Sequence, residues 1–189
     1  MQLECFEIVF IEANYEEIIL PSLWEQQTFV DKAGSEIINQ MWAFKDKGNR
    51  DVCLIPEVTG LVQELWRDKW SKESKQKKVF YVSRCYRYEK PQAGRYREFT
   101  QFGVELLGNR TETETKELFD LLRKCVDKFD IKYKWNESVK RGLTYYTDSG
   151  FEIACENLGA QKQIAGGGPY AEGIGWAIGV DRLLLATVS

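Results

Sequence analysis

Two periodicities of hydrophobic and polar positions run along the chain and predict its secondary structure. Alternation at every second residue is typical of strands with one buried face, and repetition every three to four residues is typical of helices. The first residues predict a short amphipathic helix. The apolar run YEEIILPSLWE then predicts a strand that ends at a turn or sheet edge near Pro21, and this edge is a candidate contact between subunits.

Residues 40–66 predict a pair of antiparallel strands followed by a helix. Two apolar stretches flank the turn Lys47-Gly48-Asn49, and the second stretch ends near Ile55. A helix is predicted from near Thr59. It carries its apolar side chains on one side: Leu61, Val62, Leu65 and Trp66.

A second hairpin and a covering helix are predicted after the lysine-rich stretch RDKWSKESKQKK. VFYVSRCYRYE and the alternating YREFTQFGVELLG flank the turn-like KPQAGR, which indicates two strands joined by a longer loop. Thr111 and Glu114 have the spacing of a capping box. The residues that follow lie on one helical face, which predicts a helix over the sheet: Leu118, Leu121, Leu122, Cys125, Val126 and Phe129.

The C-terminal part predicts more strands and a final helix. GLTYYTDSGFEIAC indicates two short strands joined at residues 148–150, and IAGGGPYAEGIGWAIGVDRLLLAT indicates a glycine-rich strand that turns into a helix. Hairpins outnumber regular strand-helix-strand units, so the predicted fold class is α+β, with an antiparallel β-sheet flanked by helices. The length of 189 residues and the 43% hydrophobic content fit a single domain over residues 1–189.

The charge balance restricts the partners of the chain. A formal net charge of -3 argues against a surface that is basic all over, so any polyanion is expected to meet a local patch. Residues 86–99, YRYEKPQAGRYREF, concentrate arginine, lysine and aromatic rings and form such a patch. The glycines have neither the GxGxxG spacing of a dinucleotide fold nor a GxxxxGK[ST] phosphate loop.

Cysteine and histidine usage excludes several kinds of chemistry. The five cysteines are scattered and never spaced as CxxC, which is typical of a reduced cytoplasmic protein. We expect no membrane span and no signal peptide. The chain has no histidine, so Ser-His and Cys-His nucleophiles are excluded. The remaining chemistry rests on arginines, carboxylates, hydroxyls, backbone amides or a hard cation such as Mg²⁺.

Five stretches in order carry a resemblance to a known family. They are ILP at residues 19–21, LIPEVTG from Leu54, YRYEKPQAGRYREFTQFGVE from Tyr86, RGLTYYTDSGFE from Arg141 and GGGPYAEGIGWAIGVDRL from Gly166. Together they resemble the catalytic domain of histidyl-tRNA synthetase, a class II aminoacyl-tRNA synthetase. The resemblance covers most of the chain and implies the class II catalytic fold.

The resemblance implies an ATP site built on arginines. Arg87 is expected to hold the α-phosphate, Glu89 to contact the adenine side and Phe99 to stack on the base. Arg182 is expected on the other face of the adenine and near the γ-phosphate, and Arg95 near the outer phosphates. A planar guanidinium suits both tasks because it offers forked hydrogen bonds and a stacking face.

The resemblance also implies a catalytic Arg141 and a histidine pocket. Arg141, with Arg87 and Arg182, is expected to stabilise the charge that builds on the α-phosphorus. The residues implied in amino-acid binding are Glu57, Thr59, Gln101, Glu105, Tyr145, Tyr146 and Gly167. Carboxylates suit an ammonium group, and glutamine suits a neutral ring nitrogen.

The chain departs from the family pattern at several places. Thr144 stands where the family usually has Asp, and Pro169 and Ala171 stand where it has Arg and Asp. These changes touch the amino-acid pocket. The long inserted domain of the family between Gly108 and Arg141, and its C-terminal anticodon-binding domain, have no counterpart in this sequence.

Three functions remain open at this point. The chain is a minimal core that activates histidine with ATP and charges tRNA(His), or a short paralogue that passes an amino acid to another acceptor, or a non-catalytic relative like the regulatory subunit of ATP phosphoribosyltransferase. The basic stretch RDKWSKESKQKK is either a contact to RNA phosphates or a solvated connector. The resemblance further implies a homodimer, a cytoplasmic location and Mg²⁺ bound with ATP, for which Glu98 and Glu152 are candidate ligands.

Overall fold

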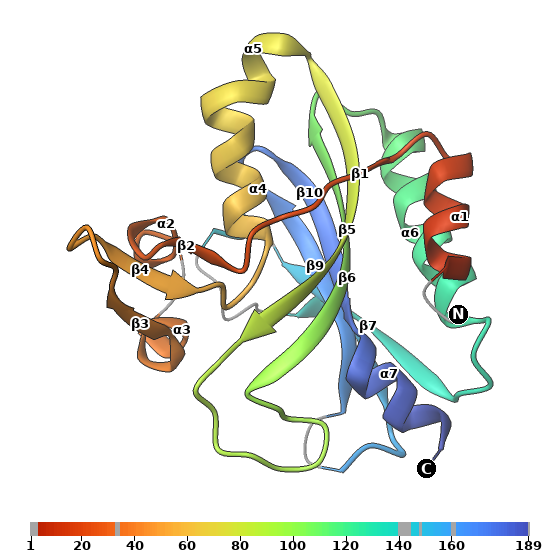
Figure 1. The fold of residues 1–189 in the computed structure, drawn as a ribbon. Coiled ribbons are helices and arrows are strands. Elements are labelled where there is room, and N and C mark those ends of the chain that lie inside the picture. Colours follow the sequence, from red (N-terminus) through yellow and green to blue (C-terminus); the bar gives the residue numbers. More distant parts are fainter. Residues whose placement is uncertain (1–3, 33–34, 140–144, 148, 160–161, 189) are drawn as a thin grey trace.

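A seven-stranded mixed sheet organises the computed structural model, which describes residues 4–32, 35–139, 145–147, 149–159 and 162–188 (Figure 1). All neighbouring strands of this sheet are antiparallel except the pair β1 and β5. The strand order is β1 (Glu16–Glu17), β5 (Gln76–Tyr86), β6 (Glu98–Gly108), β10 (Gly173–Gly179), β9 (Gln163–Tyr170), β8 (Gly150–Cys155) and β7 (Tyr133–Val139). The predicted α+β class is confirmed.

A smaller sheet projects from one side of the main sheet and contains the first predicted hairpin. Its order is β2 (Leu23–Glu25), β4 (Asp51–Leu54) and β3 (Trp42–Lys45), all antiparallel. Two short helices, α2 (Gln27–Val30) and α3 (Ser35–Gln40), lie in the connection before β3. In Figure 1 the hairpin of β3 and β4 reaches away from the rest of the molecule.

The strand predicted to end at a sheet edge near Pro21 is present as the edge strand β1, but it is only two residues long. The stretch YEEIILPSLWE forms β1 in the main sheet and β2 in the small sheet, and residues 18–22 connect the two. Pro21 lacks an N–H group and cannot continue a ladder on both sides. The chain therefore leaves β5 after the bond from Ile18 N–H to Phe80 O and joins the small sheet where Ser22 O accepts from Ile55 N–H.

Alternation along β6 gives the main sheet two different faces. Phe102, Val104 and Leu106 are buried in one hydrophobic cluster with α1 (Glu4–Glu12), α6 (Glu112–Val126) and α7 (Val180–Thr187). Leu107 on the opposite face belongs to a second cluster, with α4 (Thr59–Leu65). Figure 1 shows α1 and α6 beside each other on one side of the sheet and α4 on the other. The face that carries α4 is thus left with polar positions at residues 101 and 105 of β6.

The remaining helices extend or bound these layers. The helix predicted from near Thr59 is confirmed, because α4 begins at that residue. The π-helix η1 (Trp66–Trp70) and the short α5 (Ser71–Glu73) continue from its end. The predicted capping box is also confirmed, because Thr111 Oγ1 accepts from Glu114 N–H at 3.2 Å and Glu114 Oε2 accepts from Thr111 N–H at 2.9 Å. Among the described residues, no helix is long and apolar enough to cross a membrane.

The C-terminal part differs most from the predictions. The glycine-rich segment is a hairpin of two strands, β9 and β10, and the sequence predicted only one strand there. β7 was not predicted at all. Of the two strands expected around residues 148–150, β8 is present, whereas residues 145–147 form only an isolated bridge between Tyr146 and Tyr170 and residues 140–144 lie outside the described part.

The capping box predicts a specific loss of stability. Thr111→Ala removes the acceptor for Glu114 N–H, and we expect it to lower the free energy of unfolding by about 1 kcal/mol. Thr113→Ala, two residues away on the exposed first turn of α6, serves as the matched control and leaves the stability unchanged or slightly raised. Urea denaturation of the three proteins measures the effect, and equal midpoints for Thr111→Ala and Thr113→Ala would contradict it.

Candidate active site

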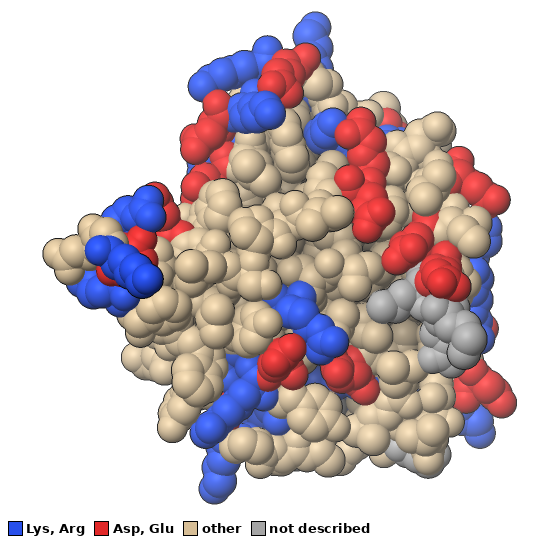
Figure 2. All heavy atoms as spheres, in the orientation of Figure 1, with Lys and Arg blue, Asp and Glu red and all other residues tan. Residues whose placement is uncertain are grey.

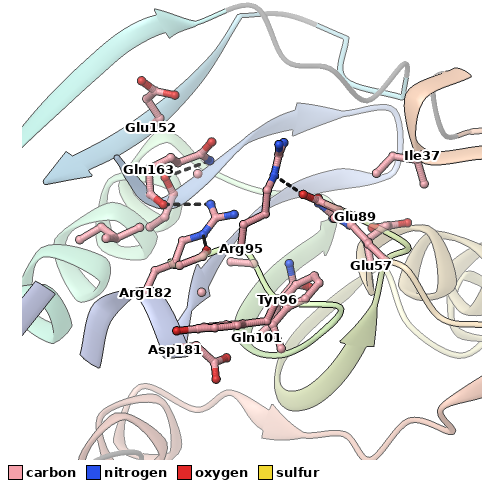
Figure 3. Close-up of a pocket in the computed structure, with 18 of the residues that line it drawn as sticks. Ile37, Glu57, Glu89, Arg95, Tyr96, Gln101, Glu152, Gln163, Asp181 and Arg182 are labelled. Carbon is pink, nitrogen blue, oxygen red and sulfur yellow. Dashed lines mark hydrogen bonds and ion pairs between the residues drawn. The ribbon is translucent and has the colours of Figure 1, made fainter. Parts of the chain in front are cut away.

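A polar cavity of about 330 Å³ lies on the α4 side of the main sheet (Figure 3). Its walls come from the start of α4, the loop between β5 and β6, strands β6, β9 and β10, and the start of α7. The cavity brings together ten residues that the sequence placed in the site: Glu57, Thr59, Arg87, Glu89, Arg95, Phe99, Gln101, Tyr145, Tyr146 and Arg182.

Two predicted site residues do not line the cavity, and for a third, Arg141, the prediction stays untested because Arg141, like Thr144, lies outside the described residues. Gly167 packs against the neighbouring strand, where a Cβ would overlap Gly175 O, so its lack of a side chain serves the β9–β10 pairing. Glu105 lies beneath the cavity wall and is fully buried.

Two of the arginines that line the cavity are held by backbone carbonyls. Arg87 Nε donates to Pro56 O at 2.9 Å, and its guanidinium lies 5.2 Å from the centre of the Phe99 ring. Arg182 Nε donates to Gly94 O at 2.6 Å and Nη1 to Gln163 O at 3.1 Å. Because carbonyls carry no net charge, both guanidinium groups keep their positive charge available for an anionic ligand.

A third arginine of the cavity has a carboxylate partner. Arg95 forms an ion pair with the buried Glu89, and Figure 3 shows this contact across the cavity from Arg182. Burial lowers the pKa of Arg182 below its ordinary value, and the positive charges of Arg87 and Arg95 lower it further, against an opposing effect of Glu89. The cluster is thus positive overall, and a phosphate group between these side chains would relieve the repulsion.

A buried carboxyl group, that of Glu57, also lines the cavity. Glu57 is 4% exposed; its Oε1 accepts from Gly60 N–H at 2.9 Å and its Oε2 from Tyr145 Oη at 3.3 Å. Burial raises the pKa of this carboxyl, with the Gly60 hydrogen bond acting in the opposite direction. A buried carboxyl with so few donors is suited to receive a cationic group, which restores the charged form.

Glu105 is surrounded by three hydroxyl groups. Thr59 Oγ1 and Tyr170 Oη donate to its two oxygens at 2.7 Å each, and Tyr81 Oη donates at 3.3 Å. The room for this cluster comes from glycine, because a Cβ at position 175 would overlap the Glu105 carboxylate. Burial raises the pKa of Glu105 to about 7, although all three hydroxyls act to lower it.

Sequence reasoning missed several residues of the site. Asp181 Oδ2 accepts from Thr100 N–H at 2.6 Å, which ties the first turn of α7 to β6 beside Phe99. Its signal was present in the GVDRL stretch, directly before Arg182. Tyr96, Gln163 and Gln40 also line the cavity, but nothing in the sequence pattern distinguishes them from exposed polar residues.

The described residues offer limited ligation to a metal ion. They contain no group of three or more Cys, Asp or Glu side chains arranged around a common point. Glu152 lines the cavity and accepts from Asn136 Nδ2 at 3.1 Å, whereas Glu98 pairs with Arg84 away from it. Of the two candidate Mg²⁺ ligands, Glu152 therefore lines the cavity and Glu98 does not, and a role of either in binding Mg²⁺ stays a prediction.

Comparison with known proteins agrees with this geometry. The family model described as Histidyl-tRNA synthetase matches residues 7–135. The histidine--tRNA ligase of Sulfolobus acidocaldarius is 38% identical over 131 residues, which cover 69% of this chain and 31% of that protein. The histidine--tRNA ligase of Methanosarcina acetivorans is 28% identical over 277 residues, covering 90% of this chain and 67% of that protein. Because this chain has 189 residues, the second alignment includes segments of the relative that have no counterpart here.

Solved structures show the same fold. Apo histidyl-tRNA synthetase of S. aureus has a TM-score of 0.77 and 26% identity, over 98% of this chain and 64% of that one. A Bacillus halodurans protein described as an ATP phosphoribosyltransferase regulatory subunit/histidyl-tRNA synthetase has a TM-score of 0.81, and the superposition covers 100% of this chain and 78% of that one. Because the identity is 14%, this similarity shows the fold alone. The fold is therefore that of the class II catalytic domain. Because the family model matches well over half of the residues of this chain, the chain belongs to the histidyl-tRNA synthetase family.

Proposed function

We propose that the chain activates histidine with ATP to form histidyl-adenylate and transfers the histidyl group to tRNA(His). The observation that carries this proposal is that one cavity is lined both by Arg87, Arg95 and Arg182 and by the buried carboxyl of Glu57. This mixed lining fits a ligand pair in which a phosphate chain meets the cations and an ammonium group meets the buried carboxyl.

The first step needs alignment and charge neutralisation more than proton transfer. A carboxylate oxygen of histidine attacks the α-phosphorus of ATP, the new C–O–P bond forms, and the bond from the α-phosphorus to the bridging oxygen breaks to release pyrophosphate. Arg87 and Arg182 neutralise the phosphate oxygens, and Phe99 supplies a ring for the adenine. A site without histidine side chains is adequate for this step because the nucleophile is already ionised.

The second step is transfer to RNA. A ribose hydroxyl at the tRNA end attacks the carbonyl carbon of the adenylate, AMP leaves with the electrons of the mixed anhydride bond, and the hydroxyl proton passes to the departing phosphate. Histidine and tRNA as substrates follow from the relatives, whose printed name is histidine--tRNA ligase. This chain aligns with about one third to two thirds of their length, so the activity of the whole relatives is part of the proposal.

We further propose that the chain is a homodimer that associates through the link between the two sheets. Ile19 in this link is 92% exposed and Leu23 in β2 is 44% exposed, and the link starts from β1, whose outer edge has no partner strand among the described residues. Apolar side chains next to an unpaired strand edge are a liability in a monomer, and a second copy would cover them.

Pyrophosphate exchange tests the activation step. We expect exchange of pyrophosphate into ATP to require histidine, and to fall about 100-fold or more in Arg182→Gln and Arg87→Lys, because each loses fixed charge or forked donors at the phosphates. Arg110→Gln, at an exposed arginine before α6, is the control and retains the wild-type rate.

The same assay distinguishes the other two functions. Exchange that requires a different amino acid would contradict histidine as the substrate and favour a paralogue with another pocket. Binding of histidine without any exchange would contradict catalysis and favour a regulatory role, to which the fold alone is equally suited.

The Glu105 cluster predicts a pH-dependent stability. The pKa of Glu105 in the folded protein is about 7, above the ordinary value of 4.5, so its contribution is fully present below pH 4.5 and is lost as the pH rises through 7. Relative to Glu105→Gln, which does not titrate, the wild type is expected to lose about 2 to 3 kcal/mol between pH 5 and pH 8. Urea denaturation of both proteins across this range measures the difference, and parallel pH curves would contradict the prediction.

Sedimentation equilibrium tests the homodimer. Ile19→Glu is expected to weaken association at least about tenfold, because an unpaired carboxylate would be buried in the interface. Leu184→Glu is the control and leaves the association unchanged, because Leu184 is also exposed and its helix α7 lies away from β1 (Figure 1). A wild-type protein that stays monomeric at every concentration would contradict the proposed dimer.

A further inference from the structure

Carboxylates compensate much of the positive charge in the basic stretch RDKWSKESKQKK. Arg67 pairs with Glu172 at 2.6 Å, and Lys77 pairs with Glu16 at 2.6 Å. Figure 2 shows Lys and Arg atoms beside Asp and Glu atoms around α5, at the top of the view. The stretch thus presents mixed charge to solvent, which favours a solvated connector over a contact to RNA phosphates.

A polar contact that the proposed reaction does not yet use lies beneath the cavity, between a thiol and an amide. Cys85 on β5 is fully buried, and its Sγ lies 3.2 Å from Gln101 Oε1 on β6. In the ladder Cys85 is opposite Phe99, two residues before Gln101, so all three side chains share the α4 face of the sheet. Gln101 lines the cavity and is labelled in Figure 3, whereas Cys85 does not line it. The thiol therefore reaches a ligand only through Gln101.

Burial keeps this thiol in its protonated form. It raises the pKa of Cys85 well above the ordinary value; the nearby Arg87 acts in the opposite direction and Glu57 in the same direction. The S–H hydrogen is thus present at neutral pH, and Sγ donates it to Gln101 Oε1. The reverse pairing, with the amide nitrogen donating to sulfur, is weaker because sulfur is a poor acceptor.

This hydrogen bond decides which end of the Gln101 amide faces the cavity. Ser83, directly opposite Gln101 in the ladder, donates its hydroxyl to Arg84 O at 3.4 Å instead. Within the described part of the chain, Cys85 is the one side chain hydrogen-bonded to Gln101. An amide group is planar and carries its oxygen and nitrogen on separate branches, so an oxygen held toward the buried thiol turns Nε2 toward the cavity.

From this geometry, and resting on the proposed function, we propose that Cys85 is a positioning residue for amino-acid specificity: it holds Gln101 Oε1 so that the Nε2 hydrogens meet an acceptor atom of the substrate. A neutral ring nitrogen is such an acceptor. An amino acid with a donor or a cation at that point is disfavoured, because two facing donors leave each other unpaired. Without the thiol the amide turns about its last torsion, which is broad, and presents either end.

Variants of Cys85 test the proposal. Calorimetric titration with histidine measures binding, and pyrophosphate exchange gives the KM for histidine and the KM for ATP. We expect Cys85→Ala to weaken histidine binding about three- to tenfold and to raise its KM by the same factor, since one neutral hydrogen bond that orders the amide is lost. The KM for ATP stays unchanged. Cys85→Ser keeps a donor and is expected to bind histidine within about twofold of the wild type.

Cys53→Ala is the matched control. Cys53 is fully buried in the same hydrophobic cluster as Cys85, and burial is the one cause that raises its pKa to about 11. The same atoms are removed, so we expect a similar loss of stability in urea denaturation but unchanged histidine binding. Equal weakening of histidine binding by Cys53→Ala and Cys85→Ala would overturn the proposal, because packing would then explain both.

A double variant tests whether Cys85 acts through Gln101. In a Gln101→Ala background, Cys85→Ala is expected to change the histidine KM no further. Additive losses in the double variant, wild-type affinity in Cys85→Ala, or a Cys85→Ser protein as weak as Cys85→Ala would each overturn the proposal.

Calorimetry requires no catalysis, so the role of Cys85 and the proposed function fail separately. The expected pattern of histidine binding in a protein without exchange activity would support the role of Cys85 and refute the proposed function. Normal exchange with unchanged histidine binding in Cys85→Ala would refute the role of Cys85 alone. A wild-type protein that binds no histidine would overturn both.

Discussion

The burial of ionisable groups on one face of the main sheet is the constraint on which the rest of the structure depends. The alternation along β6 gives one face to a conventional apolar core and places Gln101 and Glu105 on the other. A carboxyl in such a place is costly unless it is hydrogen-bonded or protonated. The hydroxyls around Glu105 and the glycine opposite it in β10 are therefore consequences of placing that carboxyl there, and they fix the spacing of the strands beneath the cavity.

The arginines of the cavity are also ionisable groups that need hydrogen-bond partners, but their partners are of a different kind. Arg87 and Arg182 bind backbone carbonyls instead of carboxylates, so the structure satisfies their N–H groups without cancelling their charge. The carbonyl of Gly94 belongs to the loop between β5 and β6, and Asp181 ties the start of α7 to β6. Helix α7 thereby fixes the loop that also carries Tyr88 and Arg97.

Local signals made much of this fold predictable from sequence, and long-range contacts account for the rest. The β5–β6 hairpin and the capping box depend on turn residues and spacings a few positions apart, and both were predicted. The motifs also predicted ten cavity residues, since those stretches meet in one place. No local signal indicates that β7 pairs with β8 or that the chain passes from one sheet to the other around Pro21. Nor does any local signal indicate that Tyr170, 65 residues away, donates a hydrogen bond to Glu105. Arg141, the expected third catalytic arginine, stays a prediction, as does the single domain over residues 1–189.

The fold alone does not distinguish catalysis from histidine sensing. The energetic cost of placing Arg87, Arg95 and Arg182 close together is relevant to this distinction. Mutual repulsion and burial both disfavour the charged form of Arg182, so the cluster reduces the stability of the empty protein. A module that only binds histidine would gain nothing from this arrangement, because histidine offers a single carboxylate for the cations to meet. A triphosphate offers several negative charges in a row and offsets the cost on binding. A nucleotide in the cavity would explain the arrangement, and this feature, more than the shared fold, supports the proposed activating enzyme.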